Sequence, residues 1–370
     1  MRQRVLQAVL LVHAIEQSDL AGDALSLDDR AHATREAADG RALPAVGDAT
    51  TPINGDSERF LVRRADALLA RLRVRSPGVD RVLAAAASPA GLDRTILLLG
   101  FLLGVAIAFA EDGRIDIFAY PLIGLVVWNL IVYAVLIVRA FRSPRPGHQA
   151  FGAVAAREAV ALQRDGFFRR WLARLYANRV HARIDALITH SIGFNAPLAP
   201  GLRRFATDWS EVGRPLFRER ARRLLHLAAI LAGAGLMAGY DIRGWLLRQA
   251  AGWGTTVFGP ASAHTALVTL YGAASAVSGV SIPSAHDIQS LAWTSPTAGG
   301  GPAGLWLYLI DWTVLLYIVL PRLIAVIVTT VSLWRYSATL RTPPQFSGYL
   351  ASVLRPLSPS PEPPPPTPSG

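Results

Sequence analysis

Four long apolar stretches, almost free of charge, constrain the fold of this chain more than any other feature of its sequence. They cover residues 95–110, 117–138, 224–240 and 303–320, and only the last contains a charged side chain, Asp311. A helix needs about 20 mostly apolar residues to cross the hydrocarbon core of a bilayer. The two shorter stretches each need a flanking arginine that reaches the interface. The pattern predicts an all-α membrane protein with about four transmembrane helices.

The distribution of arginine predicts how these helices are oriented. Residues 1–94 carry 13 arginines and 13 acids, and residues 139–223 carry 17 arginines and 6 acids. The connections 111–116 and 241–302 have no excess of arginine. Because cytoplasmic loops retain basic residues, we expect both termini inside. The chain then divides into a cytoplasmic N-terminal helical region (1–94), a first transmembrane hairpin (95–138), a basic cytoplasmic helical region (139–223), a third transmembrane helix (224–240), an outer loop (241–302), a fourth transmembrane helix with its continuation (303–334) and a proline-rich disordered tail (335–370).

One segment of the outer loop does not fit a simple count of spans. Residues 249–285 contain no acid or arginine but are rich in Gly, Ser, Thr and Pro. A fifth span at about 263–282 would place the C-terminal arginines outside. We therefore interpret 249–285 as a re-entrant or interfacial element, which requires a backbone that is buried in protein or lines water.

Local patterns predict helices in the regions outside the spans. An N-terminal amphipathic cytoplasmic helix is indicated by the helical spacing of Val5, Val9, Val12 and Glu16. Ser26, followed three residues later by Asp29, is typical of a capped helix start, and that helix should reach about Ala38. Residues 40–57 read as a flexible linker, and a basic amphipathic helix follows with an apolar stripe of Leu61, Ala65, Leu68 and Leu72.

Asp311 is the main candidate for an intramembrane functional site. Insertion of an ionisable side chain into a membrane costs about 2.5–3.5 kcal/mol, so such a residue usually has a functional role. The functional interpretation is a proton, ion or gating site that faces Asn129 in the second span. The structural alternative is a polar group near the outer interface. Further along, Pro321 and Arg322 predict an end or kink of the fourth span at the cytoplasmic face, with Arg322 among the lipid headgroups.

The densest arginine cluster lies where the basic region meets the third span. It is a candidate surface for a partner or for anionic lipid, and comprises Arg214, Arg218, Arg220, Arg222 and Arg223. Positive-inside topology with headgroup contact explains the same residues without a partner. Nucleic acid is not expected, since the chain has no module with aromatic stacking platforms.

Small residues at four-residue spacing predict close helix packing. Gly100 and Gly104 repeat in the first span, and Gly235 and Gly239 in the third. Lipid supplies no hydrophobic drive between helices, so small residues that allow close approach take over this role. The pairs can pack within one chain or between copies, which leaves a homo-oligomer open.

The residue inventory excludes several kinds of chemistry. All 37 basic residues are arginine and there is no cysteine, so lysine and thiol chemistry are absent. There is no P-loop, no Gly-x-Ser-x-Gly and no His-Glu-x-x-His motif, and three scattered residues of the outer loop lack metal-ligand spacing. We expect no enzyme activity, cofactor or metal, and any nucleotide-driven process must use the hydrolysis of another chain.

The order of several short motifs resembles a bacterial family of integral membrane proteins known as domain of unknown function 2868. The matching blocks are Leu10-Leu11-Val12-His13-Ala14-Ile15-Glu16, Leu27-Asp28-Asp29-Arg30-Ala31-His32-Ala33-Thr34, Ile115-Asp116-Ile117, Pro121-Leu122-Ile123-Gly124-Leu125-Val126-Val127-Trp128-Asn129-Leu130, Leu225-His226-Leu227-Ala228-Ala229, Tyr240-Asp241-Ile242-Arg243-Gly244, Ala251-Gly252-Trp253-Gly254-Thr255-Thr256 and Leu320-Pro321-Arg322. Gly254 departs from the pattern, because the family tends to carry a Glu after the Gly-Trp pair. The resemblance implies no established activity, but it implies a GTPase partner, since members are commonly encoded beside one.

Together these features predict a multi-pass protein of the bacterial inner membrane. We expect a membrane anchor or effector for a soluble GTPase, contacted through the arginine-rich cytoplasmic regions. The alternative is a small ion channel or transporter that uses Asp311 and residues 249–285.

Overall fold

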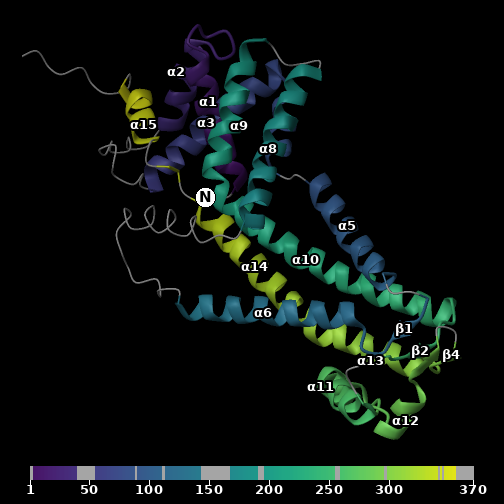
Figure 1. Ribbon diagram of the computed structural model, residues 1–370. Helices are drawn as coiled ribbons and strands as arrows, with labels where there is room; N and C mark the ends of the chain where they lie inside the picture. The colour runs from purple at the N-terminus through teal and green to yellow at the C-terminus, as the bar shows by residue number, and fades with distance from the viewer. Residues whose placement is uncertain are drawn as a thin grey trace, which may run out of the picture. The chain divides into compact units, whose positions relative to one another are not determined.

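The computed structural model describes a mostly helical chain that divides into two compact units (Figure 1). It describes residues 3–39, 55–87, 90–110, 113–142, 167–190, 196–254, 259–295, 298–340, 342–343 and 346–355. Unit 1 comprises residues 1–89, 170–219 and 332–370, and unit 2 comprises residues 90–169 and 220–331. Most of the predicted linker 40–57, and residues 143–166 of the predicted basic cytoplasmic region (139–223), lie outside the described residues.

Unit 1 is a helical assembly drawn from three separate parts of the chain. Its helices are α1 (Gln3–Ser18), α2 (Leu27–Ala38), α3 (Gly55–Arg75), α4 (Val79–Ala87), most of α8 (Phe167–His190), the short 3-10 helix η1 (Ala196–Leu198), α9 (Ala199–Val212) and α15 (Phe346–Leu354). The N-terminal helix α1 packs against α3, α4 and α9. Its contact with α9 is close, because a Cβ atom on Gly201 would lie 2.8 Å from the Cα of Ile15.

The helix α1 is buried on all sides, which corrects the amphipathic helix that we predicted there. Every residue from Leu6 to Val12 is buried, as are Ala14, Ile15 and Glu16. The spacing of the valines suggested one apolar face, but apolar residues also occupy the other faces and helices cover them. This helix is therefore the core of unit 1 and not a surface element.

The start of α2 confirms the predicted cap. The hydroxyl of Ser26 accepts a hydrogen bond from the backbone N–H of Asp29 at 3.1 Å, and the Asp29 carboxylate accepts one from the backbone N–H of Ser26 at 3.2 Å. This reciprocal pair satisfies two N–H groups that the first turn of a helix leaves without partners. The helix ends at Ala38, where the sequence predicted its end.

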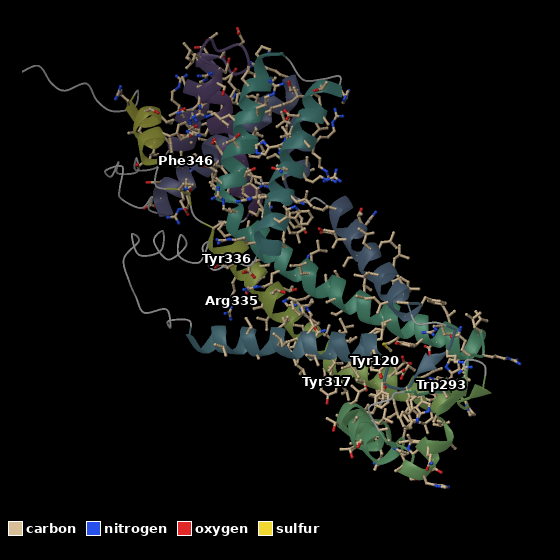
Figure 2. All side chains as sticks on the ribbon, in the orientation of Figure 1. Tyr120, Trp293, Tyr317, Arg335, Tyr336 and Phe346 are labelled. Atoms are coloured by element: carbon tan, nitrogen blue, oxygen red, sulfur yellow. The ribbon has the colours of Figure 1, made fainter. Side chains whose placement is uncertain are left out.

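The helix α15 lies in the segment that we expected to be a disordered tail (335–370). Phe346, labelled in Figure 2, is buried together with Leu350 and Leu354. Three apolar side chains at a spacing of four residues give this short segment a face that can pack, although prolines are frequent around it. The expectation of disorder is wrong for residues 346–354.

Unit 2 contains the apolar helices. Its elements are α5 (Ala90–Ala108), β1 (Ile115–Asp116), α6 (Tyr120–Arg142), most of α10 (Arg214–Asp241), the π-helical η2 (Ile242–Leu246), β2 (Ala251–Gly252), α11 (Pro260–Ser278), α12 (Ala285–Ser290), β3 (Trp293–Ser295), β4 (Ala298–Gly299), α13 (Gly304–Val314), the π-helical η3 (Leu315–Val319) and most of α14 (Leu320–Thr339). The strands form two small pairs. β1 and β2 are parallel, with Ile115 opposite Ala251, and β3 and β4 are antiparallel.

Three helical stretches are long and apolar enough to cross a membrane. They are Val79–Ala108, Arg214–Leu246 and Gly304–Ala338, and the apolar stretch Tyr120–Val135 of α6 is shorter. Large apolar side chains are exposed along α5, α6 and α14, among them Leu98, Leu99, Leu102, Leu103, Trp128, Ile131, Ile324, Ile327 and Val328. Apolar surface of this extent is unusual on a protein surrounded by water and suits contact with lipid.

The helix from Gly304 to Thr339 does not end at Pro321, so the predicted end of the fourth span there is wrong, whereas the alternative of a kink stays a prediction. Pro321 has no N–H to donate to the carbonyl of Tyr317, and the hydroxyl of Tyr133 donates a hydrogen bond to that carbonyl at 3.0 Å instead. The π-helical turn η3 precedes the proline directly. The prediction for Arg322 was also wrong, because this side chain is buried within unit 2 and is only 8% exposed.

The predicted re-entrant segment 249–285 contains β2 and the helix α11. α11 packs against α13 through a buried stripe of Ala263, Leu267, Tyr271 and Ala274. The hydroxyl of Tyr271 donates to the backbone carbonyl of Ile117 at 2.8 Å. α11 is not among the three stretches that can cross a membrane by length and composition.

Candidate functional sites

A buried ionic cluster links four helices of unit 1, namely α1, α2, α3 and α15. The guanidinium of Arg64 in α3 donates to both carboxylate oxygens of Glu16 in α1, at 2.6 Å and 2.9 Å. The same guanidinium donates to the hydroxyl of Tyr349 in α15 at 2.6 Å and to the hydroxyl of Thr34 in α2 at 2.8 Å. The Tyr349 hydroxyl in turn donates to Glu16. Burial and the Glu16 carboxylate raise the pKa of Tyr349 well above its ordinary value, so the hydroxyl remains protonated and able to donate.

Asp19 organises the turn between α1 and α2 next to this cluster. Burial opposes its ionisation, but its carboxylate accepts hydrogen bonds from the backbone N–H groups of Asp23, Ala24 and Leu25 and from Arg30. These bonds favour the charged form, and the pKa of Asp19 is lowered. Arg30 is thereby tied to Asp19 at 2.8 Å, whereas its Nε atom is buried without a hydrogen-bond partner among the described residues.

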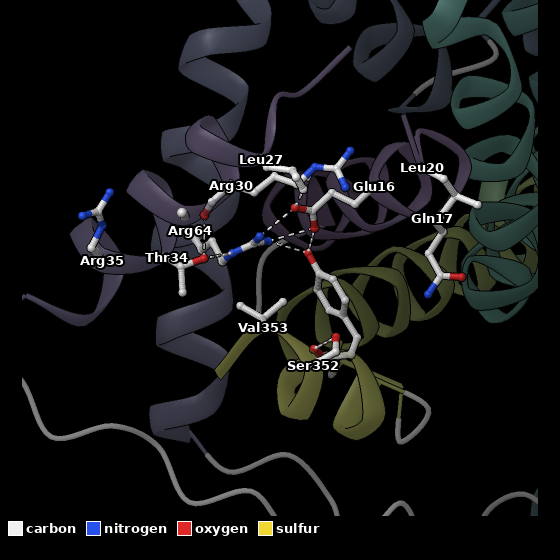
Figure 3. A pocket seen from close by; sticks show the side chains of 12 residues that line it. Glu16, Gln17, Leu20, Leu27, Arg30, Thr34, Arg35, Arg64, Ser352 and Val353 are labelled. Atoms are coloured by element: carbon white, nitrogen blue, oxygen red, sulfur yellow. Dashed lines mark hydrogen bonds and ion pairs between the residues drawn. The ribbon is translucent and has the colours of Figure 1, made fainter. Parts of the chain in front are cut away.

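A cavity of about 690 Å3 opens beside this cluster (Figure 3). Its wall is formed by Glu16, Gln17, Leu20, Leu27, Arg30, Ala31, Thr34, Arg35, Arg64, Tyr349, Ser352 and Val353. A cavity of this size is within the usual range for small-molecule sites. All of the residues that line it belong to unit 1.

His13 of α1 contacts two aromatic rings of α15. Its ring centroid is 4.4 Å from that of Phe346 and 4.7 Å from that of Tyr349. Burial and the positive charge of Arg204 lower the pKa of His13 to about 4, although Glu16 acts in the opposite direction. The ring is therefore neutral near pH 7 and serves as a packing surface for α15.

A second polar cluster lies in unit 2 around Arg322 and includes Asn129. The Arg322 guanidinium donates twice to the Asn129 side-chain oxygen, at 2.7 Å and 3.0 Å, and lies 3.1 Å from Nδ1 of His226 in α10. Its carbon atom is 5.5 Å from the centre of the Tyr133 ring. Among the described residues, Arg322 forms no ion pair with a carboxylate. Neutral groups from α6 and α10 therefore hold this buried cation.

The structure does not bring Asp311 and Asn129 together as we predicted. Asn129 binds Arg322, whereas Asp311 lies in α13, where one carboxylate oxygen is buried without a hydrogen-bond partner among the described residues. Asp241, at the end of α10, acts electrostatically on the Asp311 carboxylate. The Asn129 amide oxygen accepts both bonds from Arg322, and its N–H group donates to the backbone carbonyl of Leu125 at 2.8 Å.

The four glycines lie where α5 and α10 cross at short distance (Figure 1). A Cβ atom on Gly100 would lie 2.7 Å from the backbone oxygen of Ala228, and one on Gly239 would lie 2.5 Å from the Cβ of Ala108. Cβ atoms on Gly104 and Gly235 would meet the backbone of the facing helix at still shorter range. The backbones of the two helices approach so closely that a methyl group has no space.

Arg243 connects the end of α5 to the outer loop and was not a sequence candidate. It is buried and donates to the backbone oxygens of Ala108 and Arg114 and, at 2.8 Å, to the side chain of Gln249. The bond to Ala108 supplies a partner for a carbonyl at the C-terminal end of α5. The role is structural, because these three acceptors belong to separate segments of unit 2 that Arg243 holds together.

The arginine cluster occupies the first turns of α10. Arg214 is exposed, and the side chains of Arg218, Arg220, Arg222 and Arg223 are half-buried. Among the described residues, no three His, Asp or Glu side chains lie together as metal ligands. The cluster itself presents positive charge and no catalytic group.

Sequence reasoning missed the cluster of Glu16, Arg64 and Tyr349. A charged residue inside the apolar run of α1 was the available signal for Glu16. No motif connects it with Arg64, which is 48 residues away, or connects Arg64 with Tyr349, which is 285 residues away. The partners become visible only when the fold brings their helices together.

The folds and sites described above define a mostly helical chain with membrane-compatible helices and a polar cavity outside them. No protein-family model, curated protein or solved structure matches the chain. The resemblance to the family of unknown function, and the GTPase partner that it implies, stay predictions.

Proposed function

We propose that this chain is a multi-pass protein of the bacterial inner membrane that anchors a soluble partner at the cytoplasmic face. In this proposal unit 2 spans the bilayer, unit 1 lies in the cytoplasm, and the partner is the GTPase that the family resemblance implies. The chain itself has no P-loop, so the partner would supply the nucleotide hydrolysis.

The observation that carries the topology is the assembly of unit 1 from three parts of the chain. Trp209 of α9 donates to the backbone oxygen of Ala86 in α4 at 3.1 Å, and Tyr349 of α15 bonds to Arg64 of α3. Segments that pack together occupy the same side of a membrane. An even number of crossings must therefore separate each segment from the next, which supports two crossings by α5 and α6 and two by α10 and by α13 to α14.

The length of α6 supports its place as a span. Tyr120–Arg142 contains 23 residues. At a rise of 1.5 Å per residue this corresponds to about 34 Å, which exceeds the hydrocarbon thickness of about 30 Å. Trp128 and Ile131 are exposed on its surface, as expected for side chains that contact lipid.

The arginine cluster at the start of α10 is the proposed partner surface. With the assigned topology it lies at the cytoplasmic end of a span, where positive charge would meet lipid headgroups and an acidic partner. Nucleotide state in the partner can act on this chain only if one state binds more tightly than the other.

A pull-down from the native host tests the proposal. The tagged chain is isolated in mild detergent with a non-hydrolysable GTP analogue or with GDP, and retained proteins are identified by mass spectrometry. We expect a GTPase that is retained preferentially in one nucleotide state and is reduced by Arg214→Gln, whereas the exposed control Arg203→Gln retains it. Equal retention in both states would remove the effector role, and the absence of any GTPase would overturn the proposal.

An ion channel or transporter is the second candidate, and Asp311 is the observation that favours it. A buried carboxylate oxygen without a hydrogen-bond partner is expensive in a membrane and is retained for a reason. Proton or cation flux into liposomes that contain the purified chain would support this candidate if Asp311→Asn abolishes it and the exposed control Asp66→Asn does not. Liposomes with no flux above protein-free controls would reject it.

A further inference from the structure

The cavity beside the Glu16 and Arg64 pair is lined by both charged and apolar side chains. Arg30, Arg35 and Arg64 line it together with a single acid, Glu16. Leu20, Leu27 and Val353 line it as well, and Figure 3 shows Leu20 and Arg35 on opposite sides of the space. An occupant would therefore meet both positive charge and apolar surface.

The arginines differ in how much of their charge is already neutralised. Arg64 is bound to Glu16, and Arg30 is bound to Asp19 at 2.8 Å while its Nε atom lies 4.0 Å from the Glu16 carboxylate. Arg35 is exposed and forms no ion pair with a described residue. Its charge is therefore the one that an anion placed in the cavity would neutralise.

The apolar part of the lining is formed by side chains that a folded helical unit normally covers. Leu20, in the turn between α1 and α2, is 87% exposed. Leu27, the first residue of α2, is 72% exposed. Val353 of α15 is half-buried and lines the same cavity. A short apolar chain would be stabilised by burying part of this surface.

We propose that the cavity binds a small amphipathic anion, with one carboxylate or phosphate head group and a short apolar chain. The head group would accept hydrogen bonds from Arg35, and the chain would lie on the apolar side chains of the lining, Leu20, Leu27 and Val353. Because α15 supplies Val353, Ser352 and Tyr349, the bound ligand would also tie α15 to α1 and α2. The proposal does not depend on the partner protein or on the orientation in the membrane, since all these residues lie in unit 1.

Calorimetric titration of the full chain in lipid nanodiscs tests this site, with empty nanodiscs as the baseline. The probes are hexyl phosphate and hexanoate, which share the chain but differ in head group, compared with hexanol and inorganic phosphate. We expect saturable binding, with one site per chain, of one or both amphipathic anions. Preference for hexyl phosphate or for hexanoate identifies the head group. Binding of hexanol or inorganic phosphate as tight as that of either amphipathic anion would overturn the proposal.

Two variants and two matched controls locate the binding. Arg35→Gln removes the exposed charge and should weaken binding by about tenfold or more, the effect expected for a hydrogen bond to a charged group. Ser352→Trp fills the cavity from an exposed position of α15 and should abolish binding. Arg59→Gln and Val74→Trp change exposed residues outside the cavity and should bind as the unchanged chain does. Unchanged binding in both cavity variants would show that the probes bind elsewhere and would overturn the assignment.

Discussion

Arg64 is a buried cation whose charge is acceptable only while Glu16 is present. The two side chains are 4% and 8% exposed, so solvent cannot take over the role of the missing partner. Asp185 and Arg203 form an exposed pair at 3.3 Å, in which water screens both charges. The same kind of pair therefore has very different consequences at the two places.

We predict that Glu16→Ala destabilises unit 1 by about 3–5 kcal/mol, because it leaves the Arg64 charge buried without a counter-charge. Hydrogen exchange of α1 and α3, read by mass spectrometry, should become about a hundredfold faster or more. The control Asp185→Ala removes a carboxylate from an exposed pair and should change exchange little. Similar acceleration in both variants would contradict the role given to burial.

A pH dependence follows from His13. Its pKa is lowered to about 4 in the folded chain, against about 6.5 in the unfolded chain, so the unfolded state binds the proton more readily. The contribution of His13 to stability is present above pH 6.5 and is lost as the pH falls from about 6.5 to 4. The lowered pKa of Asp19 adds a further loss at lower pH, below its ordinary value of 3.8.

We predict that His13→Phe reduces the fall in melting temperature between pH 6.5 and pH 4. The phenyl ring keeps the packing against Phe346 and Tyr349 but has no proton to bind. Thermal unfolding of the chain in nanodiscs, followed by circular dichroism at several pH values, measures the slope. The exposed control His32→Gln should leave the slope unchanged, and an unchanged slope in His13→Phe would reject the explanation.

At the scale of elements, the contact of α5 with α10 depends on the absence of side chains. A methyl group on Gly104 would overlap the backbone oxygen of Ala232. Gly124 in α6 has nothing within 4 Å of an added Cβ atom, so the same substitution there has space. The two glycines separate the effect of packing from the effect of helix propensity.

We predict that Gly104→Ala separates α5 from α10 and lowers stability by about 1–3 kcal/mol, the usual cost of overpacking. Gly124→Ala should be neutral or stabilising by up to about 1 kcal/mol, because alanine favours the helix. Thermal unfolding in nanodiscs compares the two variants. Equal melting temperatures would show that α5 and α10 do not need this close contact.

The sequence predicts elements well where the signal is local. The cap of α2 depends on Ser26 and Asp29, which are three residues apart, and both were identified. The stretches that can cross a membrane depend on composition alone, and three of them meet the criteria of length and hydropathy. The helix α15 was missed because prolines dominate its surroundings, while its stability comes from contacts with the distant residues His13 and Arg64.

The sites were less predictable, because a side chain's partner is decided by tertiary structure. Asn129 was identified as a polar residue inside a span. However, we expected Asp311 to be its partner and placed Arg322 among the lipid headgroups. Nothing in either local sequence shows that Arg322 lies 2.7 Å from the Asn129 oxygen. The spacing of apolar residues predicts which face of a helix is buried. This prediction was wrong for α1, because other helices cover every face of that helix.

At the scale of the whole molecule, the natural absence of cysteine gives a direct test of topology. Each introduced cysteine is the only thiol in the chain, so a membrane-impermeant maleimide reports one position at a time. We predict that Val74→Cys, Trp171→Cys and Ser352→Cys react only after cells are opened, because the proposed topology places unit 1 in the cytoplasm. Gln289→Cys in α12 should react in intact spheroplasts. Reaction of any of the first three in intact spheroplasts would contradict the assigned topology.

Because unit 1 is assembled from distant parts of the chain, it cannot finish folding until the last of these parts has been synthesised. α1 emerges from the ribosome before the apolar stretches, yet α9 and α15, which cover parts of it, follow much later in the chain. Until α15 has been synthesised, the apolar faces of α1 and the charge of Glu16 lack their final cover. We therefore expect nascent chains to expose this core, and a ribosome that stalls before residue 346 to leave it open to proteases.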